Sequence, residues 1–358
     1  MTAATEPHPA RARPEATLAK AARENFPVAP FFLPRAWRAD LMAVYGYARL
    51  VDDIGDGDLD PAGGDAAVLL GEGPCDLAGG PEADGPRRPA ADPVADRRPD
   101  GERRREPVAH PDPSGRVTRP VAGAAEPAVP AVDRLALLDA AERDLHRVFA
   151  PGGEPRHPLL RALRPLVRRQ GLTPEPFLAL IEAGRRDQRV TRYRSWEDLL
   201  GYCELSANPV GRLVLAVTGT TSAERVRRSD AVCTGLQVVE HLQDVAEDLT
   251  RGRIYLPADA MARHGVREED LRRPEGSPSV RALVREEALR AHALLDEGGP
   301  LVRGVTGRLR LLLAGFVGGG RAALGAIAAA GYDVLPEPPR PSRTALLRAV
   351  AVTLRREG

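Results

Sequence analysis

Two groups of acidic residues recur at intervals suited to binding divalent cations. In the first, Asp52 and Asp56 lie four residues apart in the segment YGYARLVDDIGD, where Tyr45 and Arg49 precede them. On a helix, residues four apart project from one face, so these side chains would share a face. Unpaired like charges at this spacing destabilise an isolated helix by a few tenths of a kcal/mol. The pattern therefore indicates that a bound cation supplies the missing positive charge.

The second group lies in the segment LQVVEHLQDVAEDLTRGRIYLP. Its members share one face of a predicted helix and are Gln237, Glu240, Asp244 and Asp248. Mg²⁺ prefers carboxylate oxygens and commonly bridges a few carboxylates to substrate phosphates. Two such stripes that face each other would hold ions that bind a diphosphate from both sides. Arg251 and Arg253 follow directly, and their guanidinium groups would complement phosphate oxygens.

Simpler interpretations of these residues have to be weighed. One pair of aspartates four residues apart is most often a solvated helix face, but two pairs that adjoin arginines are harder to explain in that way. His241 has no second histidine at metal-ligand spacing, so we expect a surface or core histidine. The run from Gly318 to Gly320 lacks the GK[ST] ending of a phosphate loop and instead predicts close helix approach. No Ser/His/Asp or Cys/His nucleophile arrangement is evident.

Helical periodicity predicts the elements that would position these groups. Apolar residues recur at i, i+3 and i+4 in most of the chain, alternating strand-like runs are scarce, and no repeat of 20–50 residues is visible. The ranges predicted as helices are 39–54, 133–149, 174–189, 196–203, 209–218, 223–248, 279–297 and 304–330. We therefore predict an all-α bundle whose helices surround a shared interior.

One long segment differs in composition from the rest of the 358 residues. Residues 57–131 are rich in Pro, Gly, Ala, Arg and Asp, and no aromatic residue occurs between Tyr47 and Phe149. Such a segment buries too little apolar surface to offset its ordering entropy. We predict a disordered insertion at 57–131 within a domain at 21–335. Residues 1–20 are predicted to be a disordered tail, and 336–358 a tail or short helix.

Charge and hydropathy restrict the class of protein. The formal net charge of +1 predicts no strong field for nucleic acid. Three cysteines without metal spacing are typical of a reduced cytoplasmic chain. The N-terminus has no apolar signal-peptide core. The most apolar stretch is interrupted by Arg310 and Arg321, which leaves no uncharged run of the ~20 residues that span a bilayer. We expect a soluble cytoplasmic protein that could contact a membrane surface peripherally.

These motifs resemble those of the squalene/phytoene synthase family, and more narrowly its hopanoid-pathway branch, the hydroxysqualene synthases. The resemblance rests on both acidic segments, on the opening ENFPVA at 24–29 with LPR at 33–35, and on YCELSANPVG at 202–211. The segment AGFVGGGRAALGAI is similar to the family's closing helix. Matches run from about residue 20 to 335, apart from the insertion.

The resemblance implies an isoprenoid synthase fold, a helical bundle around a central cavity, with Mg²⁺ as cofactor. It assigns Asp52, Asp56, Asp244 and Asp248 to magnesium and diphosphate, and Tyr45 and Arg49 to diphosphate and channel contacts. The further residues expected to bind substrate are Phe26, Asp53, Asn208, Gln237, Glu240, Arg251, Arg253 and Tyr255. Many members have Asn and Arg where this chain has Glu240 and Gln243. Glu240 is therefore expected to be an additional metal ligand, whereas the arginine's contact is lost.

The implied reaction is conversion of presqualene diphosphate to hydroxysqualene, by ionisation, carbocation rearrangement and water capture. One alternative is head-to-head condensation of two prenyl diphosphates to presqualene diphosphate, squalene or phytoene. A second alternative is a non-catalytic helical scaffold derived from the family. The expected partners are an isoprenoid diphosphate and, at most, enzymes of the same pathway, with no nucleic acid.

Overall fold

The structure is a computed structural model, and it describes residues 14–22, 28–59, 64–71 and 133–357. These residues belong to one compact unit. Within these ranges the chain is helical and has no strand, apart from an isolated bridge between Arg192 and Ile254. The all-α class expected from the periodicity is therefore confirmed.

The elements follow one another along the chain. They are α1 (Pro14–Ala19), η1 (Lys20–Ala22), α2 (Arg35–Asp56), α3 (Asp65–Leu70), α4 (Arg134–Phe149), α5 (Pro158–Gln170), α6 (Glu175–Asp187), α7 (Trp196–Ser206), α8 (Asn208–Val217), α9 (Ala223–Gln243), α10 (Val245–Thr250), α11 (Ala258–Arg263), η2 (Glu268–Arg272), α12 (Pro278–Gly298), η3 (Gly299–Leu301), α13 (Gly307–Ala329) and α14 (Arg343–Arg356).

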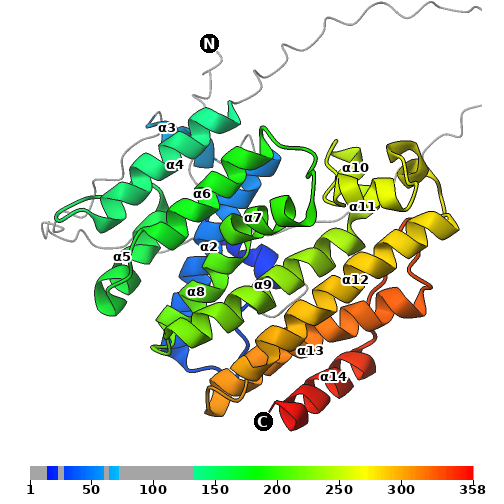
Figure 1. Cartoon of the computed structure of the whole chain (residues 1–358). Helices are drawn as coiled ribbons and strands as arrows, with labels where there is room; N and C mark the ends of the chain where they lie inside the picture. Colours follow the sequence, from blue (N-terminus) through cyan, green and yellow to red (C-terminus); the bar gives the residue numbers. More distant parts are fainter. Residues whose placement is uncertain (1–13, 23–27, 60–63, 72–132, 358) are drawn as a thin grey trace, which may run out of the picture. The chain divides into compact units, whose positions relative to one another are not determined.

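The long helices pack in a continuous sequence of neighbours (Figure 1). Helix α2 packs on α4, α5, α6 and α8, whereas α9 packs on α8, α12 and α13. Helix α14 lies against α13 at the other side of the bundle. Tyr47, Leu50 and Ile54 of α2 are fully buried, and the Tyr47 hydroxyl donates to the Phe177 carbonyl at 2.8 Å. Helix α2 is therefore a central element, and its position fixes the first acidic group.

The end of α2 is defined by glycines. Gly57 follows the last helical residue with φ of +78°, and its N–H donates to the carbonyls of Asp53 and Ile54. This left-handed conformation stops the helix directly after Asp56. At Gly55 a β-carbon would stand 3.6 Å from the Gly184 Cα, so the absence of side chains lets α2 and α6 approach closely.

The helix predicted at 223–248 is interrupted, which corrects that prediction. Helix α9 ends at Gln243, and α10 begins at Val245. Asp244 between them has φ −103° and ψ 15°, outside the helical region. The backbone bonds from Asp244 N to the Glu240 carbonyl (3.0 Å) and from Asp248 N to the Asp244 carbonyl (2.8 Å) are nevertheless made. The bend is therefore local, and it falls where several carboxylates are crowded together.

Helix α13 confirms the prediction of close helix approach at its glycines. A β-carbon at Gly318 would lie 2.8 Å from the Val350 Cα, so α14 packs directly on the backbone of α13. By length and hydropathy α13 could cross a membrane, but 61% of its apolar window is buried inside the bundle. That burial is typical of a core helix.

Two short helices lie where the composition had predicted none. Helix α3 falls inside the predicted insertion, and it is fixed by the buried Leu69 and by Asp65, which lies 3.0 Å from His157 Nε2. A six-residue apolar segment such as DAAVLL is hidden when composition is averaged over 75 residues. Helix α1 falls in the predicted N-terminal tail, and its Leu18 packs against α2 at Gly46. The remainder of the predicted insertion, 72–131, lies outside the described residues.

Candidate functional site

Three helices end close together, and each ends with a carboxylate. Helix α2 ends at Asp56, α6 ends at Asp187, and Asp244 caps the end of α9. The Gln188 side chain donates to the Gly55 carbonyl at 2.8 Å and so ties the end of α6 to that of α2. The C-terminus of a helix carries partial negative charge, so carboxylates there are unfavourable. The site thus concentrates negative charge that requires cations.

Two arginines supply part of that positive charge. Arg253 Nη1 donates to Asp56 Oδ1 at 2.7 Å, and Arg251 Nη1 donates to Asp56 Oδ2 at 2.9 Å. Their segment is held beside the end of α6, because Ile254 N donates to the Thr191 carbonyl at 3.0 Å. The first and second acidic segments, nearly 200 residues apart in sequence, are thereby joined directly.

Asp52 is reachable by water but surrounded by protein. Its side chain is 56% exposed, and its carboxylate lies 3.3 Å from Arg49 Nη1. Its pKa is nevertheless raised to about 7, first by loss of hydration among the surrounding protein atoms and next by the charge of Asp56. The Asp52 carboxylate therefore remains accessible to water although protein atoms and other carboxylates crowd around it.

The second acidic segment has the same excess of negative charge. The pKa of Asp248 is raised to about 7 by burial and by Asp244, although Arg253 and Arg251 oppose that shift. The pKa of Asp244 is also raised, mainly by burial and then by Glu247. Even with two arginines present, the pKa values of Asp52, Asp244 and Asp248 are therefore higher than those of isolated acids.

This donor set suits magnesium. The described part of the chain contains no group of three His, Cys, Asp or Glu side chains already close enough to hold a metal ion. The carboxylates approach instead from separate helices, with the arginines between them. Hard oxygen ligands with unrelieved negative charge are what Mg²⁺ requires, and Mg²⁺ is usually bound by a few carboxylates together with substrate phosphates. The residues present therefore fit the cofactor expected from the sequence.

Other residues predicted to bind substrate lie away from the acidic helix ends or position a neighbouring side chain. Asp53 is buried and accepts from Arg49 Nε at 2.8 Å and Lys20 Nζ at 2.7 Å, so we assign it to positioning Arg49 rather than to substrate. Asn208 is buried between α8 and α9, where it accepts from the Thr234 hydroxyl at 2.9 Å. Tyr45 is half-buried on α2 and Glu240 is exposed on α9. Phe26 lies outside the described residues.

Sequence reasoning missed Asp187, which lies at the centre of the site. Its carboxylate accepts from the Tyr202 hydroxyl at 2.8 Å and from the Tyr255 hydroxyl at 3.4 Å. Burial raises its pKa to about 6, although these hydrogen bonds and Arg253 oppose the shift. Asp187 has no acidic neighbour at helical spacing, so only its position at the end of the predicted helix 174–189 could have indicated it.

His241 is a largely buried histidine, as its spacing predicted, and it lies beside the carboxylates. Its ring stacks on Tyr255 with centroids 3.7 Å apart and an interplanar angle of 8°, and its Nε2 lies 3.3 Å from the Gln237 amide nitrogen. Burial and the neighbouring Arg253 lower its pKa to about 3, so the ring is neutral at physiological pH. Tyr193 and Tyr202 pack around the same ring of Tyr255. An aromatic wall therefore adjoins the carboxylates.

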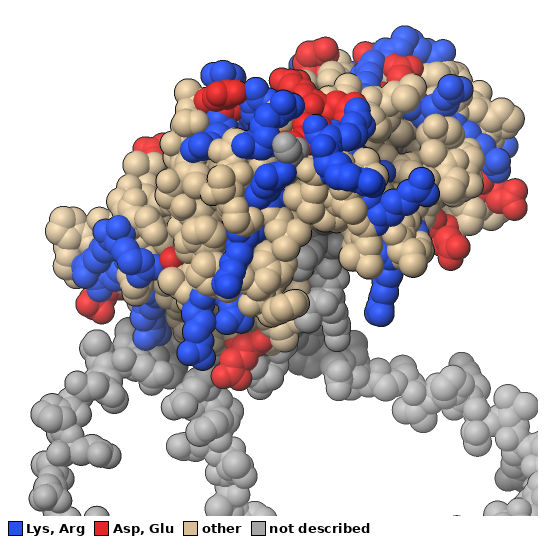
Figure 2. Space-filling model, turned by 90° about the horizontal axis from the view of Figure 1, so that it is seen from below, with Lys and Arg blue, Asp and Glu red and all other residues tan. Residues whose placement is uncertain are grey.

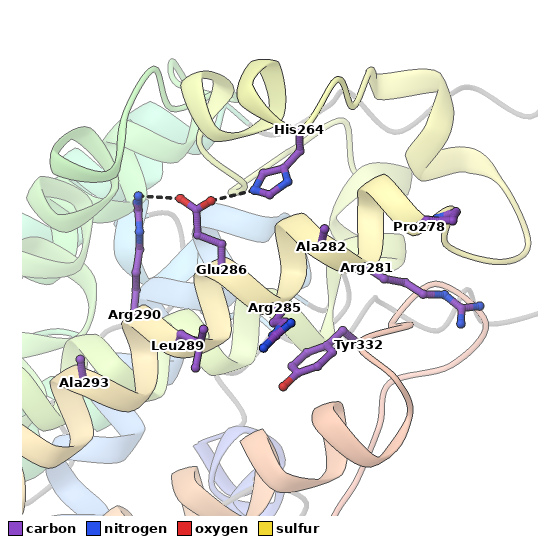
Figure 3. Close-up of a pocket in the computed structure, with 10 residues that line it drawn as sticks. All are labelled: His264, Pro278, Arg281, Ala282, Arg285, Glu286, Leu289, Arg290, Ala293 and Tyr332. Atoms are coloured by element: carbon purple, nitrogen blue, oxygen red, sulfur yellow. Dashed lines mark hydrogen bonds and ion pairs between the residues drawn. The ribbon is translucent and has the colours of Figure 1, made fainter.

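A groove elsewhere on the molecule has a different character. It has a volume of about 770 Å³ and lies along the outer side of α12. Figure 3 shows His264 and Arg290 converging on Glu286, at 2.7 and 2.8 Å, and Arg281 pairs with Asp333 at 2.7 Å. Most of these polar groups pair with one another, and the groove has no cluster of carboxylates that could hold a divalent cation, so we do not assign the chemistry to it.

The raised pKa values predict how magnesium affects stability. A carboxyl whose pKa rises from 3.8 to about 7 on folding favours the folded state below pH 4, and this advantage is lost as the pH rises towards 7. At pH 8 the folded protein therefore carries unrelieved charge at Asp52 and Asp248. We expect Mg²⁺ to raise Tm more at pH 8 than at pH 6, by about 2–4 °C for each kcal/mol of added stabilisation.

The control is the double variant Asp52→Asn/Asp248→Asn, measured by thermal unfolding with and without Mg²⁺. In this variant, the rise in Tm caused by Mg²⁺ should be nearly the same at pH 8 and pH 6. Burial also raises the pKa of Glu287 to about 7, so this residue too makes stability depend on pH. The comparison with the double variant separates the contribution of Asp52 and Asp248 from that of Glu287. If both proteins respond alike to Mg²⁺ at the two pH values, the two carboxyls do not bind the ion.

Comparisons with known proteins identify the family. A model of the squalene/phytoene synthase family matches residues 19–110 and 116–349. The hydroxysqualene synthase of Sinorhizobium fredii is 41% identical over 141 residues, which are 39% of this chain and 48% of that protein. The hydroxysqualene synthase of Zymomonas mobilis is 39% identical over 166 residues, 46% of this chain and 54% of that protein. The chain thus spans about half the length of the curated relatives it matches.

Solved structures share the fold over nearly the whole chain. The squalene synthase HpnC from Alicyclobacillus acidocaldarius is 35% identical, with a TM-score of 0.63 over 89% of this chain and 94% of that one. A dehydrosqualene synthase, at 20% identity, shares the fold with a TM-score of 0.68 over 96% of this chain and 95% of that one. Because the family match extends through both acidic segments and the helices that carry them, this chain belongs to the squalene/phytoene synthase family.

Proposed function

We propose that this protein is an enzyme that converts presqualene diphosphate to hydroxysqualene with Mg²⁺. The observation that carries the proposal is the convergence of acidic helix ends, bridged by Arg251 and Arg253, with carboxyl pKa values raised to about 7. Such a site favours a ligand that brings divalent cations and a diphosphate together. The similarity to hydroxysqualene synthases supports the choice of substrate and product.

Each part of the site has a distinct task in this reaction. Asp52 and Asp56 on one side and Asp244 and Asp248 on the other would hold Mg²⁺, which would supply charge neutralisation for a departing diphosphate. Glu240 is close enough in sequence to join the second set. Arg251 and Arg253 bind the phosphate oxygens as the C–O bond breaks and its electron pair leaves with the diphosphate. Preorganised charge of this kind favours ionisation without further rearrangement of the protein.

The aromatic wall and Asp187 act on the hydrocarbon side. The packed rings of Tyr202, Tyr255 and the neutral His241 exclude bulk water beside the carboxylates. Capture by one water forms the new C–O bond and releases one proton. That proton passes through the Tyr202 hydroxyl to the Asp187 carboxylate, which accepts from it at 2.8 Å. A pKa of about 6 suits Asp187 to this transfer near neutral pH.

The product distinguishes the proposal from its nearest alternative. We expect the purified protein with Mg²⁺ and presqualene diphosphate to release diphosphate and form the C30 alcohol, without NADPH. Farnesyl diphosphate alone should give little product. The measurement is analysis of extracted products by gas chromatography and mass spectrometry, with EDTA in place of Mg²⁺ as the control.

The main alternative is head-to-head condensation, because phytoene synthases are also similar to this chain; the maize phytoene synthase 1 is 33% identical over 175 residues. Efficient conversion of farnesyl or geranylgeranyl diphosphate to presqualene diphosphate, squalene or phytoene would replace the proposed reaction with that one. Release of no diphosphate from any of these substrates would instead favour the non-catalytic scaffold.

A further inference from the structure

The last helix has one face that the bundle does not use. Arg343, Leu347, Ala351 and Arg355 recur at four-residue intervals along α14 and are all exposed, with Leu347 70% exposed. The opposite face packs on α13, where Val350 lies against Gly318. Arg310 also donates to the Leu354 carbonyl at 3.4 Å. The inner face of α14 therefore packs on the bundle, whereas its outer face is exposed.

The outer face of α14 is uniformly basic. Arg348 and Arg356 are exposed beside the stripe that contains Arg343 and Arg355. Across the described ranges, none of these four side chains has a recorded ion pair or hydrogen bond. Glu357, just beyond the helix, is buried and faces Arg321 instead. Figure 2 shows the molecule from the side on which α14 lies in Figure 1, with blue Lys and Arg side chains across the middle of the face and red ones mainly toward its margins.

Arginines on several other helices pair with carboxylates, whereas the exposed arginines of α14 have no such pair within the described residues. Arg185 pairs with Asp139, Arg212 with Asp230 at 2.7 Å, and Arg228 with Glu224 at 2.7 Å. On α14 the positive charges surround an exposed leucine and have no acidic neighbours on the same face. A flat face of that kind matches an extended anionic surface with an apolar layer beneath it.

We propose that the outer face of α14 docks on a lipid bilayer that contains anionic headgroups. Each arginine near such a surface contributes about 1 kcal/mol of attraction, and the exposed leucine adds burial in the headgroup region. The helix is about 21 Å long, and Arg343, Arg348 and Arg355, which lie on the same side as Leu347, can reach the headgroups together. The segment that leads into it is tied to the second acidic region, because Gln243 donates to the Pro339 carbonyl at 2.5 Å. Docking would therefore hold the site at a fixed distance from the membrane.

The test is flotation of the full chain with vesicles of phosphatidylcholine alone or of phosphatidylcholine with about 30% phosphatidylglycerol. The variant is Arg343→Gln/Arg348→Gln/Arg355→Gln. Its matched control is Arg143→Gln/Arg168→Gln/Arg227→Gln, which removes the same charge from exposed positions on α4, α5 and α9. We expect the α14 variant to bind the anionic vesicles at least tenfold more weakly than the parent, and the control to bind within about twofold of it. Leu347→Ser should weaken binding by a smaller factor.

Further outcomes decide the partner. Binding of the parent should fall as salt rises, and vesicles of phosphatidylcholine alone should bind little. Equal loss in both triple variants would show a general charge effect and overturn the assignment to α14. Binding of a DNA duplex that is stronger than vesicle binding and is lost in the α14 variant would overturn the assignment to lipid. Diphosphate release in detergent solution should be unchanged in the α14 variant, so failure of this inference and failure of the proposed reaction can be told apart.

Discussion

Replacing Asp52 or Asp248 by asparagine is expected to lower kcat with presqualene diphosphate by about 100- to 1000-fold. Asparagine keeps the size and removes the negative charge, so it weakens the magnesium–diphosphate contacts where charge develops most. A loss of roughly 3–4 kcal/mol in the transition state corresponds to that factor. The measurement is steady-state diphosphate release at saturating Mg²⁺, together with calorimetric titration of Mg²⁺ in the presence of inorganic pyrophosphate.

The matched control is Asp139→Asn, which removes an exposed carboxylate of α4 that pairs with Arg185. It should leave kcat and Mg²⁺ binding within about twofold of the parent. Circular dichroism should show the same helicity for all three variants. A folded Asp52→Asn or Asp248→Asn enzyme with near-parental kcat would show that the carboxylates do not hold the metal and that the site lies elsewhere.

Replacing Arg253 by glutamine is expected to lower kcat/KM by about 30- to 200-fold. Arg253 is the more buried of the two arginines that contact Asp56, and it also faces Asp187 and Asp248. Its removal leaves carboxylates uncompensated and takes away a donor to the phosphate, at a cost of about 2–3 kcal/mol. Arg253→Lys should recover only part of the loss, because an ammonium group cannot make the bidentate contact with phosphate that a guanidinium group makes.

Two controls separate this effect from a loss of folding. Arg251→Gln removes the more exposed partner of Asp56 and should have a smaller effect. Arg194→Gln, which breaks an exposed pair with Asp198 at 3.0 Å, should be close to neutral. Inhibition by inorganic pyrophosphate with Mg²⁺ should weaken in Arg253→Gln in step with kcat/KM. If pyrophosphate inhibits that variant as strongly as the parent, Arg253 does not bind phosphate.

Local patterns in the sequence were sufficient to predict the all-α class of fold and to identify the two acidic segments. Apolar residues at helical intervals predict helices because one face of each must be buried, and most of the predicted ranges are helical in the structure. Asp52 with Asp56, and Asp244 with Asp248, could be identified because side chains four residues apart meet on a helix whatever it packs against. Arg251 and Arg253 could be proposed as phosphate ligands from their place in the second segment.

The tertiary structure decided which of these groups meet, because long-range pairing leaves no trace in local spacing. The contact between Asp56 and Arg253 depends on how α2, α6 and the segment after α10 pack. Asp187 and His241 join the site for the same reason, since each is ordinary in its own segment and acquires its environment from helices distant in sequence. The convergence of three carboxylate-bearing helix ends is a property of packing, and so are the raised pKa values that it produces.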